Sequence, residues 1–390
     1  MKIWHVTNHY QPELGYEEYY TSLNQSLNNE IIVLTSNLSV KSHHENKNIK
    51  LNNGNLKNNV NLAIKRFHVN LKYSEFFISF SFLKYFFKAP RPDIIHFHTI
   101  SQGFSILGAI IALIRKIPYV IDNHDFLFDY HPLRIKKKRI RNIIIFLEYV
   151  LIRIPLSRFV VSKAKLIIAM NQACKDYLIK NLKINQNIYD GQLCVDTKFF
   201  YKVKKQIILN KNSFCFIGQF SKRKRIDLYL ELLKLVDQNN QINNNFSFTF
   251  FLNTDVETQR NLIKNFNIFK NIQVKFRFNL SPKILSTQLD DIDALVMIAN
   301  NSVVIPEVMA KGMYVIAADM QFNKIFHNYG STFEKDSVKG ALEKIKDFIL
   351  NKKNKMKKAE EGSEFIIKNY SYNNYSLKLV EEYKKILSNG

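Results

Sequence analysis

Short apolar runs alternate with longer amphipathic segments along most of the chain. In the first half, runs rich in β-branched and aromatic residues predict buried strands at Ile3–Thr7, Ile31–Thr35, Ile94–His98, Tyr119–Asn123 and Leu166–Ala169. Helical periodicity between them predicts helices at Glu17–Leu27, Glu75–Lys88 and Phe104–Arg115. This alternation is typical of a parallel sheet that is covered by helices on both faces.

The alternation starts again in the second half. Strands are predicted at Phe214–Gly218, Phe246–Leu252, Val274–Phe278, Ala294–Ile298 and Val315–Ala318, and helices at Ile226–Val236, Val256–Phe266, Lys335–Asn351, Lys355–Asn369 and Tyr375–Leu387. A chain of 390 residues suits two domains. We therefore expect an α/β protein in which two Rossmann-like domains face each other across a cleft. The expected boundaries are 1–201 for the first domain, 202–212 for a polar linker, 213–370 for the second domain and 371–390 for a C-terminal helix.

Charge and cysteine content narrow the class of protein. The formal net charge of +24 fits nucleic acid, an anionic membrane or an anionic substrate, but the chain has no specific nucleic-acid-binding signature. Cys174, Cys194 and Cys215 show neither disulfide nor zinc spacing, which favours a reducing compartment. The N-terminus predicts a buried strand rather than a signal peptide, and no apolar run is long enough to span a membrane.

The most informative segment covers residues 300–319. Its pattern predicts a loop, a short helix that carries Glu307, a stop at Gly312 and an apolar strand. Free N–H groups at a helix N-terminus attract phosphate, and a carboxylate about one turn inside can accept hydrogen bonds from two ribose hydroxyls. The candidate backbone donors are those of Ser302, Val303 and Val304. The segment therefore predicts a nucleotide-sugar site.

This segment resembles the donor-site motif of retaining glycosyltransferases of the GT-B fold, family 4, in which E-x7-E precedes A-x-G-x-P-V-I-A. Glu307 matches the second glutamate, whereas Ala299 stands in place of the first. Further segments resemble motifs of the same family in the same order: Pro12–Glu18 (P-E-x-G-G-x-E, with Tyr16 for the second glycine), Asp93–His98 (D-x-x-H-x-H), Cys194–Phe199 (N-G-V-D-x-x-x-F), Gly218–Asp227 (G-R-x-S-x-x-K-G-x-D) and Tyr370–Asn373 (F-S-W). In the fourth of these, Gln219 replaces the arginine and Arg225 replaces the second glycine.

The residues themselves leave two readings open at each of two positions. The basic run that contains Lys224 is either a solvated turn or a clamp for a diphosphate. His124, which follows a predicted strand, either caps local structure or touches substrate.

The resemblance implies a role for each matched residue. It implies catalytic roles for His124, near the reacting carbon, and for Lys224 and Arg223, on the departing diphosphate. It implies donor binding by Gly15, Gly218, Gln219, Arg225, Ser302, Val303, Val304 and Glu307, and an acceptor-side position for Glu18, His96 and His98. It also implies that the C-terminal helix crosses back to the first domain. Neither a metal ion nor another cofactor is expected, because His96 and His98 have no obvious third ligand.

We therefore expect a retaining glycosyltransferase that moves a sugar from a nucleoside diphosphate sugar to a saccharide acceptor. We expect this acceptor to be lipid-linked and the product to be a surface polysaccharide, either lipopolysaccharide or capsule. Two alternatives remain. Because Gln219 and Ala299 depart from the family pattern, the chain could be a non-catalytic homologue that serves as the membrane-bound partner of an active transferase. It could also be a nucleotide-sugar 2-epimerase, which has the same architecture.

Two apolar segments suggest contact with an anionic membrane surface. Residues 131–153 join a basic cluster to a very apolar predicted helix, and Glu75–Lys88 contains six phenylalanines. Such a helix lies either in a protein core or in a membrane interface, and nearby basic residues attract anionic lipid. We expect a cytoplasmic protein that is peripheral on the inner face of the cytoplasmic membrane.

Overall fold

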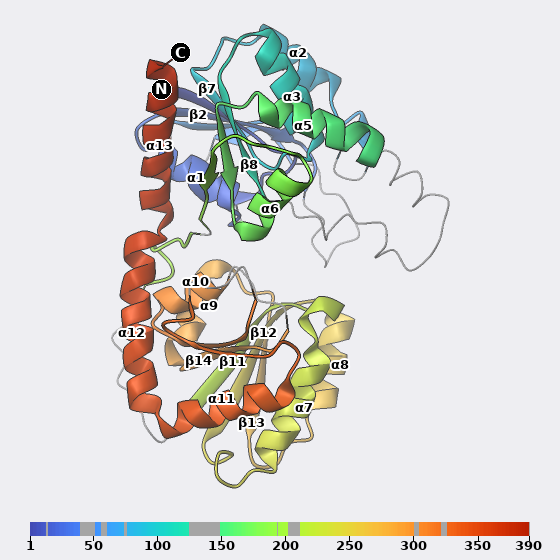
Figure 1. Ribbon diagram of the computed structural model, residues 1–390. Coiled ribbons are helices and arrows are strands. Elements are labelled where there is room, and N and C mark those ends of the chain that lie inside the picture. Colours follow the sequence, from blue (N-terminus) through green and yellow to red (C-terminus); the bar gives the residue numbers. More distant parts are fainter. Residues whose placement is uncertain are drawn as a thin grey trace. The chain divides into compact units, whose positions relative to one another are not determined.

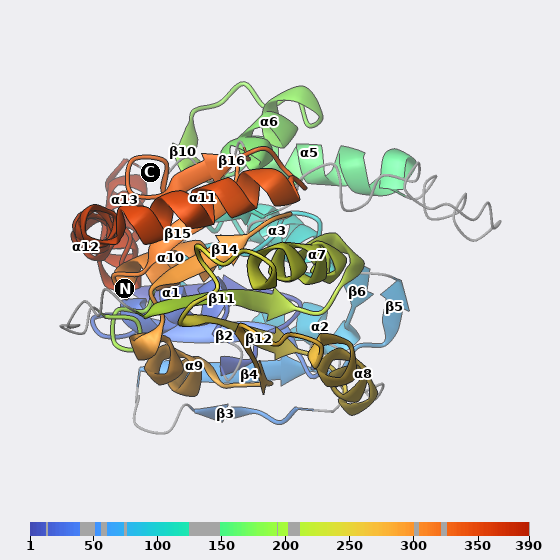
Figure 2. The same cartoon turned by 90° about the horizontal axis from the view of Figure 1, so that it is seen from below.

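The computed structural model describes residues 1–12, 15–39, 51–55, 61–73, 76–124, 149–192, 194–201, 211–299, 304–320 and 326–389. The chain divides into two compact units. The first comprises Met1–Lys41, Lys47–Leu193 and Asn373–Gly390, and the second consists mainly of Cys194–Tyr372. Each unit is built on a largely parallel sheet with helices on its faces, so the predicted α/β class is confirmed (Figures 1 and 2).

The first unit holds a sheet in the strand order β10-β9-β8-β7-β1-β2-β4-β3, in which only the short β3 runs antiparallel to its neighbour. Its elements are β1 (Lys2–Val6), α1 (Glu17–Gln25), β2 (Glu30–Ser36), β3 (Gly54–Asn55), β4 (Leu62–Phe67), β5 (Leu71–Tyr73), β6 (Phe76–Ile78), α2 (Phe80–Lys88), β7 (Ile94–Phe97), α3 (Gly103–Ile114), β8 (Tyr119–Asn123), a π-helical turn (Tyr149–Arg153), α5 (Ile154–Ser162), β9 (Leu166–Ala169), α6 (Gln172–Lys180), β10 (Ile188–Asp190) and α13 (Tyr372–Ser388). The small ribbon β5-β6 stands apart from this sheet.

The second unit has the strand order β13-β12-β11-β14-β15-β16, with every pair parallel. Its elements are β11 (Asn212–Gln219), the 3-10 turn η4 (Lys222–Lys224), α7 (Ile226–Asp237), β12 (Phe246–Asn253), α8 (Val256–Phe266), β13 (Gln273–Phe278), α9 (Pro282–Gln288), the 3-10 turn η5 (Leu289–Asp291), β14 (Ala294–Met297), α10 (Val304–Ala310), β15 (Tyr314–Ala318), β16 (Ser331–Phe333), α11 (Val338–Leu350) and α12 (Lys352–Asn369). This order is the doubly wound arrangement of dinucleotide-binding folds.

The central strands are buried along their whole length. All five residues of β8 and all five of β15 are buried. Strands covered on both faces need continuous apolar runs rather than alternation, which is why their Val- and Ile-rich sequences were readable as strands. Gly312, which follows α10, has φ +72°, and this left-handed conformation suits a glycine that ends a helix.

The helix predicted at Glu75–Lys88 is wrong in its first part. Phe76–Ile78 forms strand β6, which pairs antiparallel with β5, and the helix begins only at Phe80. The Ser79 hydroxyl accepts a hydrogen bond from the Phe82 amide and so caps the helix at this point. The apolar run continued across this cap, and periodicity alone could not locate the boundary. The expected linker also differs at its end, because Asn212 is the first residue of β11.

The final helix, α13, belongs to the first unit although it follows the second along the chain. Its Tyr383 is fully buried there, and the Tyr375 hydroxyl lies 3.9 Å from the sulfur of Met170. Among the described residues, no helix combines the length and apolar character needed to cross a membrane.

Gly103, the first residue of α3, permits close contact between this helix and β6. A Cβ at this position would lie 2.4 Å from both the backbone nitrogen and the backbone oxygen of Phe77. We predict that Gly103→Ala lowers the free energy of unfolding by about 1–3 kcal/mol, because overpacked backbone has to shift. Gly54→Ala is the matched control, since a Cβ at Gly54 meets nothing within 4 Å. Equal denaturation midpoints for the two variants would contradict this account.

Candidate functional site

In each sheet, the strand order reverses direction between two neighbouring strands. β11 and β14 are such a pair in the second unit, and β1 and β7 are such a pair in the first. Connections leave these strands toward opposite faces, so their carboxyl ends open a crevice in which ligands of α/β proteins bind. Most of the sequence-predicted site residues follow one of these strands or the adjacent β8.

Lys224 lies at the carboxyl end of β11, on the turn η4. Its side chain folds back over the strand end, because its Cε lies 3.5 Å from where a Cβ on Gly218 would stand. Burial, with a smaller effect of the neighbouring Arg223, lowers the pKa of Lys224 to about 8. A partly desolvated ammonium of this kind is well suited to an anionic ligand.

The other residues of the basic turn lie differently. Arg223 and Gln219 are exposed at the strand end. Arg225 has φ +48°, the left-handed conformation that favours glycine, at the position where the resembling family carries one. Its guanidinium donates two hydrogen bonds to Asp227, at 2.8 and 3.0 Å, so this side chain is held by a carboxylate of its own helix.

Glu307 follows β14, the strand next to β11, and so lies at the same sheet edge as Lys224. Burial, and then the nearby Asp196, raise the pKa of Glu307 from 4.5 to about 8. Its flanking residues on α10 are buried, as is Ala299 at the end of the preceding strand. Val304 begins α10, and Ser302 and Val303 lie outside the described residues. The structure therefore brings Lys224 and Glu307 to the ends of adjacent strands.

In the first unit, Gly15 forms the turn that precedes α1. It has φ +63°, and a Cβ there would lie 2.8 Å from the Tyr20 hydroxyl, so no other residue fits without strain. The turn brings Glu17 to the first position of α1, and Glu17 Oε2 lies 2.9 Å from His124 Nε2. Burial raises the pKa of the next residue, Glu18. Tyr16 is exposed, so it does not fill this turn.

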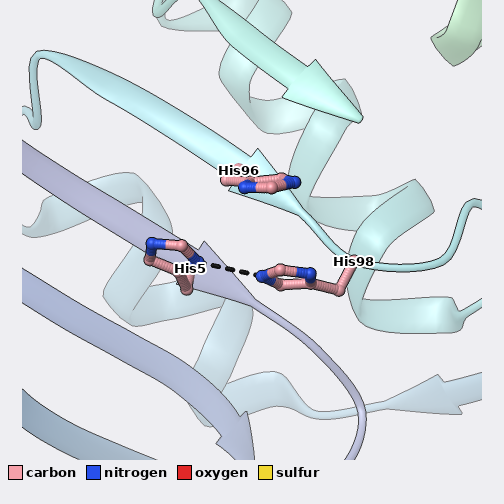
Figure 3. Close-up of side chains that lie close together, drawn as sticks. All are labelled: His5, His96 and His98. Carbon is pink, nitrogen blue, oxygen red and sulfur yellow. Dashed lines mark hydrogen bonds between the residues drawn. The ribbon is translucent and has the colours of Figure 1, made fainter. Parts of the chain in front are cut away.

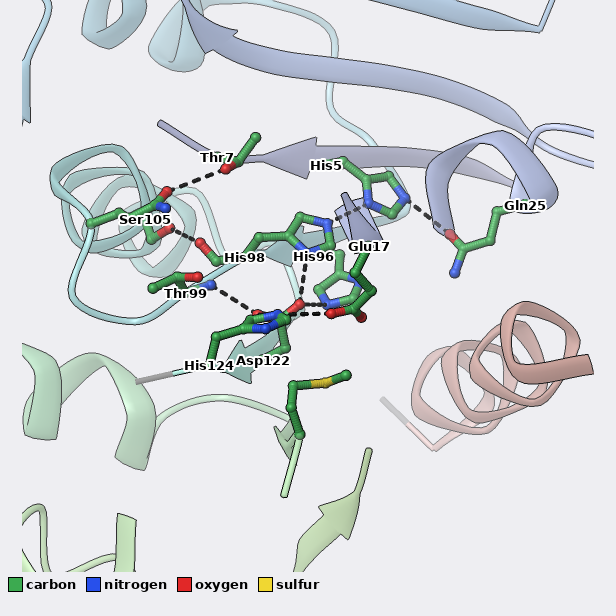
Figure 4. Close-up of polar contacts among 12 residues, drawn as sticks. His5, Thr7, Glu17, Gln25, His96, His98, Thr99, Ser105, Asp122 and His124 are labelled. Atoms are coloured by element: carbon green, nitrogen blue, oxygen red, sulfur yellow. Dashed lines mark hydrogen bonds and ion pairs between the residues drawn. The ribbon is translucent and has the colours of Figure 1, made fainter. Parts of the chain in front are cut away.

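His124 follows β8 and lies between two carboxylates. Its Nε2 is 2.9 Å from Glu17 and 3.3 Å from Asp122 Oδ1 (Figure 4). Burial alone would lower the pKa of His124, but Glu17 and Asp122 outweigh that effect and raise it well above its ordinary value. Asp122 is itself fully buried, and despite that burial His98 and His124 hold its pKa well below the ordinary value.

His96 and His98 are both buried beside Asp122, close to His5 of β1 (Figure 3). His96 is in β7 and His98 follows two residues later, so both imidazoles lie on the same side, next to Asp122. His98 Nδ1 lies 2.6 Å and His96 Nε2 lies 3.1 Å from Asp122 Oδ2. Protein groups therefore occupy these nitrogens, and an acceptor-side role for the pair stays a prediction.

Several residues of this cluster were missed from the sequence. They are His5, Glu17, Gln25, Asp122 and Tyr383, together with Asp196 in the second unit. A signal existed for three of them: His5 and Asp122 interrupt apolar strands, and Glu17 adjoins Glu18, the residue that matches the family motif. Nothing local distinguishes Gln25 or Tyr383 from other helix residues.

Comparison with known proteins gives a consistent result. Residues 23–197 match the model of Glycosyltransferase Family 4. No curated protein matches the chain at the level of sequence. Among solved structures, sucrose-phosphate synthase from Thermosynechococcus elongatus is similar, with a TM-score of 0.69 at 14% identity, over 100% of this chain and 99% of that chain.

Two other solved structures are also similar to this chain. HepE of Anabaena in complex with UDP has a TM-score of 0.69 at 14% identity, over 99% of this chain and 100% of that chain. WaaG, a glycosyltransferase involved in lipopolysaccharide biosynthesis, has a TM-score of 0.62 at 12% identity, over 97% and 98%. The chain therefore has the GT-B fold of these solved structures, and part of its first half, residues 23–197, matches the Glycosyltransferase Family 4 model.

Proposed function

We propose that this protein is a glycosyltransferase that uses a nucleoside diphosphate sugar as donor. The observation that carries the proposal is the placement of Lys224 and Glu307 at the carboxyl ends of β11 and β14, the switch point of a doubly wound sheet. Solved structures with this fold hold UDP, UDP-glucose and ADP. The resemblance to family 4 supports retention of configuration at the transferred carbon.

Lys224 acts on the leaving group in this proposal. During transfer, the bond between the sugar carbon and the diphosphate oxygen breaks, a bond to the acceptor oxygen forms, and the proton of the acceptor hydroxyl passes to the departing diphosphate. Negative charge grows on the departing diphosphate, and an ammonium fixed beside it lowers the barrier. Arg223 adjoins Lys224 on the same turn and adds charge there.

Glu307 binds the nucleoside part of the donor. A carboxylate on the first turn of α10 can accept hydrogen bonds from two ribose hydroxyls, and these donors offset the cost of ionising a half-buried group. Burial raises the pKa of Glu307 in the free protein, and the hydroxyl donors that the ribose would supply would lower it again.

A non-catalytic homologue is the second candidate, and two observations favour it. Gln219 supplies no charge at the strand end, and the buried Ala299 leaves no carboxylate at the position before the loop. Such a protein would bind the nucleotide without transferring sugar. Single-turnover assays with a panel of UDP-, GDP- and ADP-sugars separate the two candidates, because only the enzyme releases free nucleotide.

Our proposals for the acceptor and for the cellular location are based on one surface of the first unit. α2 packs beside α3, and α3 beside α5, on one face of the sheet (Figure 1). Their exposed apolar side chains are Phe80, Phe87, Ile114 and Phe159, followed by Leu151 and Ile152 on the π-helical turn, and their exposed basic ones are Lys84, Lys88, Lys116 and Arg158. We call this set the basic apolar face. Residues 125–148, which include most of the predicted apolar helix, lie outside the described residues.

Mixed apolar and basic surface of this kind binds anionic lipid. We therefore place the protein on the inner face of the cytoplasmic membrane, with a lipid-linked saccharide as acceptor in surface polysaccharide synthesis.

The pH dependence of UDP binding tests the role of Lys224. A diphosphate binds the ammonium form, so affinity should fall as pH rises through about 8, the pKa of Lys224 in the free protein. Lys224→Met should weaken UDP binding about tenfold to a hundredfold and remove this pH dependence, because a charge-assisted hydrogen bond contributes about 1.5–3 kcal/mol. The control is Lys222→Met on the same turn, and calorimetric titration measures both. Equal losses in the two variants would contradict the assignment.

Glu307→Gln should weaken UDP binding and stabilise the fold. The folded-state pKa of Glu307 is raised above 4.5, so the wild type loses stability as pH rises from about 4.5 to about 8. The amide avoids this loss, and we expect a gain of up to about 3 kcal/mol at pH 7, since each unit of pKa shift corresponds to about 1.4 kcal/mol. Denaturation curves at pH 5 and pH 7 measure it. Glu231→Gln, at an exposed position on α7, should show no such divergence.

Flotation with liposomes tests the basic apolar face. The double variant Lys84→Glu/Lys88→Glu should lose binding to vesicles that contain anionic lipid, because it reverses two charges beside the exposed phenylalanines. Lys357→Glu/Lys358→Glu, with the same charge change on α12, is the control. Absence of wild-type binding to anionic and neutral vesicles alike would remove the membrane proposal.

A further inference from the structure

Six buried side chains of the first unit form a closed circuit of polar contacts. Its members are Gln25 on α1, His5 on β1, His96 on β7, His98 just after it, Asp122 on β8 and Tyr383 on α13. The contacts in order are Gln25 Oε1 to His5 Nε2 at 2.9 Å, His5 Nδ1 to His98 Nε2 at 2.9 Å, His98 Nδ1 to Asp122 Oδ2 at 2.6 Å, Asp122 Oδ2 to His96 Nε2 at 3.1 Å, His96 Nδ1 to Tyr383 Oη at 2.7 Å, and Tyr383 Oη to Gln25 Nε2 at 3.4 Å. Figure 4 shows most of these side chains and Figure 3 the contact between two of the imidazoles.

The hydrogen-bond donors and acceptors from Gln25 through His5 and His98 to Asp122 determine where one proton lies. Gln25 Oε1 accepts from His5 Nε2, and burial lowers the pKa of His5 and keeps it neutral, so His5 Nδ1 is an acceptor and His98 donates to it from Nε2. A carboxylate can only accept, so His98 also donates from Nδ1 to Asp122, over 2.6 Å. Both nitrogens of His98 therefore carry hydrogen, and His98 is an imidazolium.

The other contacts, from Gln25 through Tyr383 and His96 to Asp122, need no extra proton. The Gln25 amide donates to the Tyr383 oxygen, and the Tyr383 hydroxyl donates to His96 Nδ1. His96 Nε2 then carries its hydrogen toward Asp122, within ion-pair distance although not in hydrogen-bond geometry. Turning the Gln25 amide around would reverse the hydrogens from Gln25 to His98 Nε2 and from Gln25 to His96 Nδ1, leave the two hydrogens that face Asp122 in place, and move the extra proton to His96. In either direction the circuit holds one proton beyond three neutral histidines and a carboxylate, which makes it electrically neutral.

The pKa shifts agree with this count. Against the effect of burial, Asp122 raises the pKa of His98, while burial and His98 lower the pKa of both His5 and His96. An ionised Asp122 in the interior needs compensation, and the circuit supplies it. The Thr99 amide donates to Asp122 Oδ1 at 2.8 Å and fixes the carboxylate further.

The circuit also touches the candidate site. Asp122 Oδ1, the oxygen outside the circuit, lies 3.3 Å from His124 Nε2, and Glu17 reaches the same nitrogen at 2.9 Å. Two carboxylates at one ring nitrogen favour a proton on it. The His124 side chain is 30% exposed, whereas that of Asp122 is 0% exposed, so His124 is where the cluster meets solvent.

The same histidines are close enough to be considered as metal ligands, in the sets His5, His96, His98 and His98, Asp122, His124. Two imidazole nitrogens on one tetrahedral zinc ion stand roughly 3.3 Å apart, given bond lengths of about 2.0–2.1 Å. His5 Nδ1 and His98 Nε2 are 2.9 Å apart and in hydrogen-bond contact. The spacing therefore suits a shared proton better than a shared ion.

We propose that Asp122, locked by a circuit that carries one extra proton, acts with Glu17 to hold His124 as an imidazolium that donates from Nδ1 to an oxygen of the substrates. The oxygen belongs to a hydroxyl or an acidic group of the sugar donor or its acceptor, and this part rests on the proposed function. His98 and Tyr383 are positioning residues that act through Asp122. The titratable groups facing His124 and the circuit are Glu17 and Glu18 from α1, His5, His96, His98, Asp122 and Tyr383.

Protonation states of the histidines test the proposal directly, by two-dimensional NMR of protein labelled with 15N-histidine. At pH 8, where an ordinary histidine with a pKa of about 6.5 is neutral, we expect two imidazolium signals. His124→Asn should remove one of them and identify it. Only neutral imidazoles from the cluster at pH 8 would overturn the proposal. This measurement needs neither donor nor acceptor, so its failure is distinct from failure of the proposed glycosyl transfer.

Conservative variants then separate the two protons. Glu17→Gln should lower the titration midpoint of His124 by more than one pH unit and leave the other imidazolium in place. Tyr383→Phe opens the circuit, so the imidazolium within it should titrate at lower pH, and His124 should follow by a smaller shift. Tyr375→Phe, which removes a buried hydroxyl from the same helix outside the circuit, is the matched control. Identical titrations for the Tyr383 and Tyr375 variants would contradict the positioning role.

Activity supplies a second readout where transfer is measurable. In Tyr383→Phe, kcat should fall on the alkaline side at a lower pH than in the wild type, with KM little changed, because the pH at which His124 loses its proton has moved. A uniform loss of activity at all pH values would indicate a merely structural role and overturn this part of the proposal.

Discussion

Both units of this protein depend on one constraint of parallel sheets. Each connection between parallel strands has to cross a face of the sheet, so a doubly wound sheet contains one place where neighbouring strands send their connections to opposite faces. That place is between β11 and β14 in the second unit and between β1 and β7 in the first. The polar and charged side chains described above gather at or next to these two places, because elsewhere helices cover the buried strands.

The two units meet the cost of buried charge in different ways. In the first, Asp122 receives hydrogens from histidines and a backbone amide, so its charge is compensated inside the protein. In the second, Lys224 and Glu307 are both shifted toward their neutral forms by burial. Buried titratable groups whose pKa values are shifted in this way are common at ligand-binding sites.

The sequence predicted the strands and the matched motifs because both are local patterns. Lys224, Glu307 and His124 each follow an apolar strand within a few residues, and a strand end is recognisable without any knowledge of tertiary contacts. Asp122 and Tyr383 were missed because their partners come from distant segments, and His96 and Tyr383 are 287 residues apart in sequence. The helix boundary at Ser79 was missed because one hydroxyl, and not the apolar pattern, determines it. The left-handed Arg225 was anticipated only as a departure from a glycine.

The return of α13 to the first unit has a consequence for biosynthesis. A ribosome releases residues 1–193 long before residues 373–390, yet the first unit includes both. Until the last segment emerges, Gln25 and His96 lack the tyrosine hydroxyl that joins them. Polar groups in the interior of the nascent N-terminal half therefore stay open to water until α13 is made. Synthesis of the roughly 180 intervening residues takes on the order of 10–40 s at ordinary elongation rates. A chain that ended before residue 373 would leave its first-made half as the incomplete one.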